Sequence, residues 1–239
     1  MEMIYMEQAI SLNNYIENLK SHSIFSAKEL HQTLFKQYSF GSFCKALSRL
    51  EDENKIERIA KGIYCKPKIS SFGLGKIPIS EQHIIHHYLG NENLNGIVTG
   101  YSLFRSYGLT TQVEKNIIIY SNKITTNIQT IQNVKIFKLN GEMTKEVKLA
   151  LEFLFIIDNF HKIQDLDYHA LLNFFKKICT NITSQNIEDA FKIQKFSKKT
   201  IAQTKIILDY FGVTNELNQY LSPVSSYKIL KMEDFYEFT

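Results

Sequence analysis

The order of short periodic segments between residues 26 and 67 restricts the fold of this chain more than any other feature of its sequence. Two segments with apolar residues at helical spacing are followed directly by two strand-like runs. The strand-like runs, KIERI (residues 55–59) and IYC (residues 63–65), are separated only by Ala60, Lys61 and Gly62. A connection this short predicts a tight antiparallel hairpin, in which Gly62 supplies the positive φ that the turn needs.

Three helices are predicted before this hairpin. The first is amphipathic over residues 9–19, and the second begins at Ser26, an N-cap residue with Glu29 three positions later. The third covers residues 42–54, where Phe43, Ala46, Leu47 and Leu50 are apolar at helical spacing. The order helix, helix, turn, helix, strand, tight turn, strand is that of a winged helix-turn-helix. We therefore predict such a domain over residues 1–70, with the hairpin as its wing.

In helix-turn-helix proteins the recognition helix enters the major groove of DNA, and a wing can reach the phosphate backbone or the minor groove. Lysine and arginine bind phosphates, and arginine also reads guanine edges. The outward positions of the third helix and the hairpin are the candidate DNA-binding residues: Ser42, Lys45, Ser48, Arg49, Arg58 and Lys61, with Gly62 in the wing turn. Basic residues gather between Lys45 and Lys68, whereas acidic and basic residues balance from Thr144 onward, which indicates a polyanionic partner for the first segment.

The same pattern fits a protein-interaction module, because winged helices also serve as protein contacts without binding nucleic acid. The acidic run Glu51–Glu53 weakens the basic character of the segment. We expect these acids at the end of the third helix, away from DNA. A partner-binding winged helix therefore remains the alternative function.

The remainder of the chain predicts a second region of α+β class over residues 80–239. Residues 69–82 (ISSFGLGKIPISEQ) are typical of a connector, with Ser80 capping the helix that follows. Residues 80–140 predict a small α/β unit with strands at NIIIYS (116–121) and VKIFKL (134–139). Residues 144–220 predict a helical bundle whose helices are capped by Thr144 and by Asp165 or Asp167, and residues 221–239 form a tail.

The stretch GYSLFRSYGLTTQV (residues 100–113), followed by a predicted strand, resembles a motif of the AbiEi-type antitoxins. The matching positions are Gly100, Gly108, Leu109, Thr110, Thr111, Gln112 and Val113, and Glu114 stands where the family usually has proline. The segment ALSRLEDENKIERIAKGIYCKP (residues 46–67) is similar to the winged helix of that family. The resemblance covers residues from about Ser26 to Leu139.

This resemblance implies a function. An AbiEi-type protein is the antitoxin of a two-gene type IV toxin–antitoxin system and represses its own operon through its winged helix. Its C-terminal part opposes a nucleotidyltransferase-like toxin that it need not bind directly. The expected partners are therefore operator DNA upstream of its own operon and a cognate toxin.

Other features favour a non-enzymatic, cytoplasmic protein. His83, His86 and His87 share one helical face at a spacing that can bind zinc, but no HExxH motif or further ligand accompanies them. Cys44, Cys65 and Cys179 form no CxxC pair, which fits a reducing compartment. The longest apolar run, LALEFLFII, is too short to span a bilayer. We predict no catalytic residue, metal or cofactor, and an enzyme that uses the histidine cluster is the third hypothesis.

Overall fold

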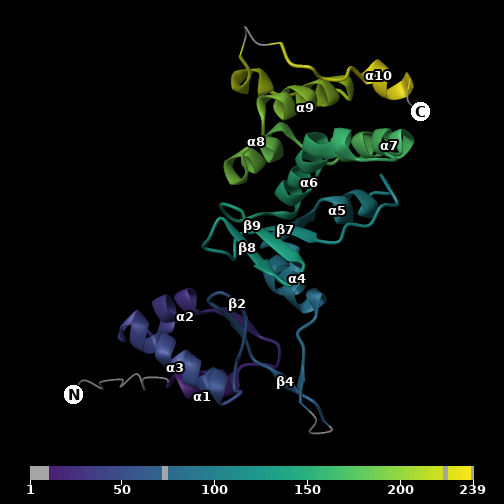
Figure 1. Cartoon of the computed structure of the whole chain (residues 1–239). Helices are drawn as coiled ribbons and strands as arrows, with labels where there is room; N and C mark the ends of the chain where they lie inside the picture. Colours follow the sequence, from purple (N-terminus) through teal and green to yellow (C-terminus); the bar gives the residue numbers. More distant parts are fainter. Residues whose placement is uncertain (1–10, 72–74, 223–225, 238–239) are drawn as a thin grey trace, which may run out of the picture. The chain divides into compact units, whose positions relative to one another are not determined.

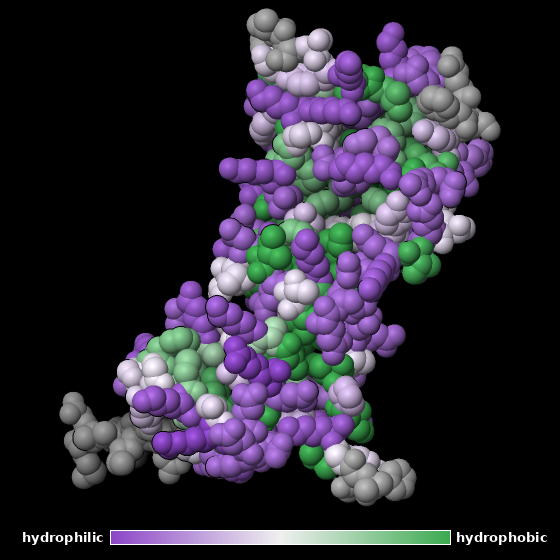
Figure 2. Space-filling model, in the orientation of Figure 1, coloured by the Kyte–Doolittle hydropathy of each residue, from purple (hydrophilic) through white to green (hydrophobic). Residues whose placement is uncertain are grey.

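The structure is a computed structural model of the 239-residue chain and describes residues 11–71, 75–222 and 226–237. The chain divides into two compact units, Met1–His87 and Tyr88–Thr239, each with its own core (Figure 1). Helices and small sheets occur in both, which confirms the predicted α+β class. Hydrophilic side chains dominate the face drawn in Figure 2. Within the described ranges, no helix has both the length and the apolar character needed to cross a membrane.

The first unit combines three helices with a three-stranded antiparallel sheet. Its elements are α1 (Leu12–Asn18), β1 (Ile24–Ser26), α2 (Ala27–Leu34), α3 (Phe40–Asp52), β2 (Glu57–Ala60) and β3 (Ile63–Cys65). The sheet order is β1-β3-β2. Ser26 caps α2 as predicted, because its hydroxyl accepts from the Glu29 amide. The three-residue strand β1 was not predicted from the sequence.

The predicted connector contains more structure than its composition indicates. β4 (Lys68–Ile69) and β5 (Lys76–Ile77) pair antiparallel across residues 70–75. The helix α4 (Glu81–Leu89) then begins after Ser80, whose hydroxyl accepts from the His83 amide. The cap at Ser80 was therefore predicted correctly, whereas two-residue strands are too short to leave a periodic signal.

The second unit begins with a four-stranded sheet of order β6-β7-β9-β8. Its elements are η1 (Asn91–Asn93), β6 (Gly96–Thr99), α5 (Tyr101–Ser106), β7 (Ile117–Ser121), β8 (Ile128–Ile131) and β9 (Val134–Lys138). β7 and β9 pair in parallel, and the two outer pairs are antiparallel. β7 and β9 lie where the sequence predicts strands, whereas β6 and β8 were not predicted.

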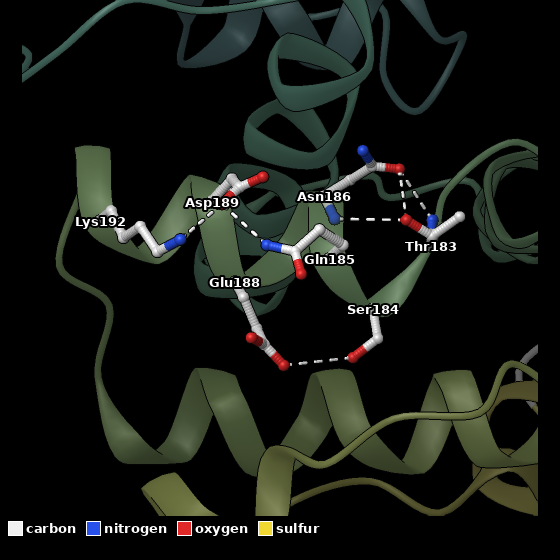
Figure 3. A network of polar contacts seen from close by, with 7 residues as sticks. All are labelled: Thr183, Ser184, Gln185, Asn186, Glu188, Asp189 and Lys192. Atoms are coloured by element: carbon white, nitrogen blue, oxygen red, sulfur yellow. Dashed lines mark hydrogen bonds and ion pairs between the residues drawn. The ribbon is translucent and has the colours of Figure 1, made fainter.

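Helices complete this unit after the sheet. They are α6 (Lys145–Asn159), η2 (Phe160–Lys162), α7 (Tyr168–Cys179), α8 (Ser184–Ile193), α9 (Lys198–Tyr210), η3 (Leu217–Tyr220) and α10 (Met232–Glu237). Thr144 caps α6 and Asp167 caps α7, as predicted, while Asp165 instead accepts a hydrogen bond from Gln112. A capping box between Thr183 and Asn186 starts α8, and side-chain contacts one turn apart continue along that helix (Figure 3).

The C-terminal tail packs on its own unit. Phe235 of α10 is fully buried, with its ring centroid 5.5 Å from that of Phe160 and 5.7 Å from that of Phe175. Before α10, the Gln203 side chain donates to the Leu230 carbonyl oxygen at 2.9 Å and accepts from the Leu230 amide at 2.8 Å. This pair of hydrogen bonds joins the tail to α9.

One buried polar pair links α5 to α6. The Tyr107 hydroxyl donates a short hydrogen bond to the Glu152 carboxylate, and Lys148 lies 3.9 Å from the same carboxylate. Burial raises the pKa of Glu152, while the Tyr107 hydrogen bond and the Lys148 charge oppose that rise. Burial and the same hydrogen bond raise the pKa of Tyr107. The hydroxyl therefore stabilises the charged form of a carboxylate whose pKa is raised by burial.

Replacing Tyr107 with phenylalanine should destabilise the protein at neutral pH. The substitution leaves a buried carboxylate without its strongest donor, which costs about 1–3 kcal/mol. It also raises the pKa of Glu152 further, so the loss should shrink as the pH falls and Glu152 becomes protonated in the folded variant. Glu152→Gln keeps an acceptor and serves as the control. Thermal unfolding at pH 7 and pH 5 tests this, and an equal loss at both values contradicts it.

Candidate nucleic-acid interface

Aromatic packing and a cap fix the start of α3. The His31 ring lies 5.2 Å from that of Phe40 and 5.4 Å from that of Phe43, and its Nε2–H donates to the Tyr38 carbonyl oxygen at 2.8 Å. The Ser39 hydroxyl accepts from the Ser42 amide at 3.1 Å, which satisfies a free donor in the first turn. The turn between α2 and α3 is thus defined by side chains on both sides of it.

The exposed face of α3 carries the polar residues that the sequence predicts to face outward. Phe43, Leu47 and Leu50 point into the core of the first unit, with 3%, 0% and 7% of their surface exposed. The opposite positions are all exposed, and each lies three or four residues from another of the set: Ser42, Lys45, Ser48 and Arg49. These four side chains therefore form a continuous polar stripe along α3.

The hairpin between β2 and β3 turns at Lys61 and Gly62. Gly62 has φ of +73°, as the sequence predicts, and a Cβ placed there would meet no atom within 4 Å. Arg58 and Lys61 are exposed, and the pairing register shifts between Arg58 and Ala60. The Ala27 amide donates to the Gly62 carbonyl oxygen at 2.9 Å, so the turn is anchored to the start of α2.

The basic residues of this region divide into two groups. Lys55 donates to the Asn13 side chain at 2.8 Å and pairs with Glu53 at 2.9 Å. Lys66 donates to the Ile16 carbonyl oxygen at 2.6 Å, at the end of α1. Within the described part of this segment, by contrast, five basic side chains make no hydrogen bond or ion pair: Lys45, Arg49, Arg58, Lys61 and Lys68. The first group holds the unit together and the second is available to a partner.

Apolar side chains are also exposed around the start of α3. Leu34, Tyr38 and Phe40 have 46%, 52% and 47% of their surface exposed. The acids, in contrast, lie at the other end of the helix. Asp52 is its last residue, and Glu53 follows it and pairs with Lys55. The candidate surface therefore has exposed apolar side chains at one end, basic residues in the middle and acids at the other end.

The predicted histidine cluster is not arranged as a ligand set. The Nδ1 atom of His83 lies 2.7 Å from the Ser80 hydroxyl, and its ring packs against that of His22, 4.7 Å away. The Nε2 atom of His22 lies 3.1 Å from the Ile77 carbonyl oxygen. In the part of the chain that the structure describes, no three His, Cys, Asp or Glu side chains are placed to hold a metal ion.

The residues of the motif at 100–113 make local contacts that define α5 and the turns beside it. Gly100 and Gly108 flank α5 with φ of +68° and +71°. The Gln112 amide donates to the Thr110 hydroxyl at 3.2 Å. Glu114 accepts from the Tyr101 amide at 3.4 Å, so this carboxylate lies at the start of α5. Local turns and caps account for these contacts.

These features define the protein as a two-unit α+β chain with an exposed basic helix and hairpin in its first unit. The chain belongs to the DUF6088 family, a family of unknown function, whose model matches residues 13–198 and so reaches into both units. No curated protein sequence matches it. Among solved structures it is similar to the RV2827C protein from Mycobacterium tuberculosis, with 11% sequence identity and a TM-score of 0.39 over 84% of this chain and 75% of that chain.

Replacing Gly62 with alanine should destabilise the first unit. An L-residue at this positive φ costs about 1–2 kcal/mol, and there is open space around the position, so no steric clash contributes. Gly41→Ala in α3 is the matched control, because that position is helical and equally open, and alanine gains up to about 1 kcal/mol there. The melting temperatures of both variants test whether the turn requires glycine. An unchanged melting temperature for Gly62→Ala would show that it does not.

Proposed function

We propose that residues 11–69 form a winged helix-turn-helix that binds double-stranded DNA, with α3 as recognition helix and the β2–β3 hairpin as wing. The element order α1-β1-α2-α3-β2-β3 supports this proposal, as does the sheet order β1-β3-β2. The strand β1 pairs with β3 on the edge opposite β2. It gives the hairpin a third strand and leaves its turn free.

The observation that carries the proposal is the unused positive charge on α3 and the hairpin. Lys45, Arg49 and Lys61 are exposed and have no partner atoms among the described residues, whereas Lys55 and Lys66 of the same segment are engaged internally. Charges held apart from carboxylates keep their full attraction for a polyanion. In this proposal Lys45 and Arg49 contact phosphates or guanine edges, helped by the hydroxyls of Ser42 and Ser48. Arg58 and Lys61 contact the backbone from the wing.

Alanine substitutions should separate base contacts from phosphate contacts. Against a fragment from upstream of its own gene, Arg49→Ala should weaken binding by about 1–3 kcal/mol if the contact is to a base edge. Lys61→Ala should weaken binding evenly across sequences and reduce the slope of log affinity against log salt by about one. Lys176 is an exposed lysine of α7, and Lys176→Ala should change neither the DNA affinity nor its salt dependence.

Fluorescence anisotropy titrations at several salt concentrations measure both effects. If Arg49→Ala and Lys61→Ala both bind the DNA fragment as tightly as the parent protein does, the DNA-binding proposal is wrong. Exposed Leu34, Tyr38 and Phe40 favour the alternative in that case, a winged helix that contacts a protein. Under this alternative, Tyr38→Ala and Phe40→Ala would remove the interaction that the charge changes leave intact.

We further propose that the protein is the antitoxin and autorepressor of a type IV toxin–antitoxin operon. The resemblance of residues 46–67 and 100–113 to AbiEi-type antitoxins supports this role. The first unit would bind the operator, and the second would oppose a nucleotidyltransferase-like toxin without a requirement for direct contact. A cytoplasmic location follows from this role, and the proposal assigns no catalytic residue.

Toxin neutralisation should survive the loss of DNA binding. The double variant Arg49→Ala and Lys61→Ala, expressed from an unrelated promoter beside the neighbouring toxin gene, should restore growth as well as the parent does. The same variant should fail to repress a reporter driven by its own upstream region. Cells with the toxin alone provide the control for growth. Failure to rescue at equal protein levels would mean that the two functions are not separable.

A further inference from the structure

A cavity of about 640 Å³ lies in the second unit, within the size range of small-molecule sites. Three segments surround it: the end of α6 with η2, the first turn of α9, and residues 228–230 of the tail. The hydrogen bonds between Gln203 and Leu230 hold the tail in place as one wall. The cavity is therefore a product of the tertiary fold, and no short sequence motif marks it.

The charged side chains that line the cavity are mostly positive. Lys162, Lys199 and Lys228 come from three different segments, and Asp158 is the one carboxylate among the described lining residues. Thr200 donates a hydrogen bond to Asp158 and lies 2.7 Å from the Ser197 hydroxyl. Lys162 retains donors beyond its single bond to Asn159. With His161 neutral, three lysines and one carboxylate leave two positive charges.

Two further features bear on the electrostatic field around the lysines, the pKa of His161 and the start of α9. Burial lowers the pKa of His161, and the positive charges of Lys199 and Lys162 lower it further. The thirteen-residue helix α9 also begins here, and Lys199 and Thr200 lie in its first turn. The positive end of the helix dipole adds to the field of the lysines.

Apolar side chains also line the cavity. Ile157 and Phe160 from α6 and η2 line it, together with Ile229 and Leu230 from the tail. A ligand that filled the cavity would thus meet both positively charged and apolar side chains. Two excess positive charges match a phosphate monoester, which carries a charge of about −1.5 to −2 near neutral pH, better than they match a single carboxylate. Lysine is also a regular phosphate ligand in proteins.

We propose that this cavity binds a small organic phosphate, with the phosphate at Lys162, Lys199 and Lys228 and the body against Ile157, Phe160 and Ile229. The site belongs to the second unit and is independent of DNA binding by the first. Two sources share this chemistry, a nucleoside monophosphate and an alkyl phosphate. Their bodies differ, so the test separates them.

Calorimetric titration of the full chain with AMP, octyl phosphate, adenosine, octanol and inorganic phosphate tests the proposal. At least one ester should bind saturably, at least ten times more tightly than inorganic phosphate and than its phosphate-free counterpart. Preference for AMP identifies a nucleotide site and preference for octyl phosphate identifies an aliphatic one. Absence of saturable binding by both esters overturns the proposal.

Variants locate the binding. Lys199→Gln and Lys228→Gln should each weaken the preferred ester about tenfold without changing the melting temperature of the free protein, and Lys176→Gln on α7 should have no effect. The bound phosphate should also raise the pKa of His161, followed by proton NMR with His161→Gln to assign the signal. Undiminished binding by both lysine variants, or an unchanged His161 titration in the bound state, would place the ligand elsewhere and overturn the proposal.

Discussion

The burial of Phe43 and Leu47 on one side of α3 is the constraint on which the proposed interface depends. Each fully buried side chain of this size contributes about 1.5–3 kcal/mol, so the first unit loses much of its stability if α3 rotates about its axis. The opposite side of the helix is thereby forced toward solvent. Lys45 and Arg49 owe their exposure to this packing, and the contacts of His31 with Phe40 and Phe43 fix where the helix begins.

Sequence reasoning succeeded where structure is determined locally. The caps at Ser26, Thr144 and Asp167 and the positive φ of Gly62 follow from a few adjacent residues, so the sequence contains all the information needed to predict them. The strands β1, β4, β5, β6 and β8 have only two to four residues each, and their pairing depends on distant segments. Periodicity gives little signal in segments of that length, and the equally short β2 and β3 were predicted because a tight turn joins them.

The candidate site shows the same division between local and distant information. Helical spacing was sufficient to predict that Ser42, Lys45, Ser48 and Arg49 face outward together. It could not reveal that the Lys66 side chain donates a hydrogen bond to the Ile16 carbonyl oxygen at the end of α1, because Ile16 is fifty residues away in the sequence. The cavity in the second unit depends on three segments spread from α6 to the tail, and only the folded chain brings them together.

The attachment of the tail to α9 has a consequence for which substitutions this chain can tolerate. Gln203 bonds to the main-chain amide and carbonyl of Leu230, which every residue except proline offers in the same form. Position 230 can therefore accept other apolar residues without loss of these two hydrogen bonds. Position 203 cannot vary so freely, because a shorter or charged side chain would lose one or both bonds. Of the two residues in this contact, one contributes its side chain and the other only its main chain, so substitutions at position 203 should destabilise the protein more.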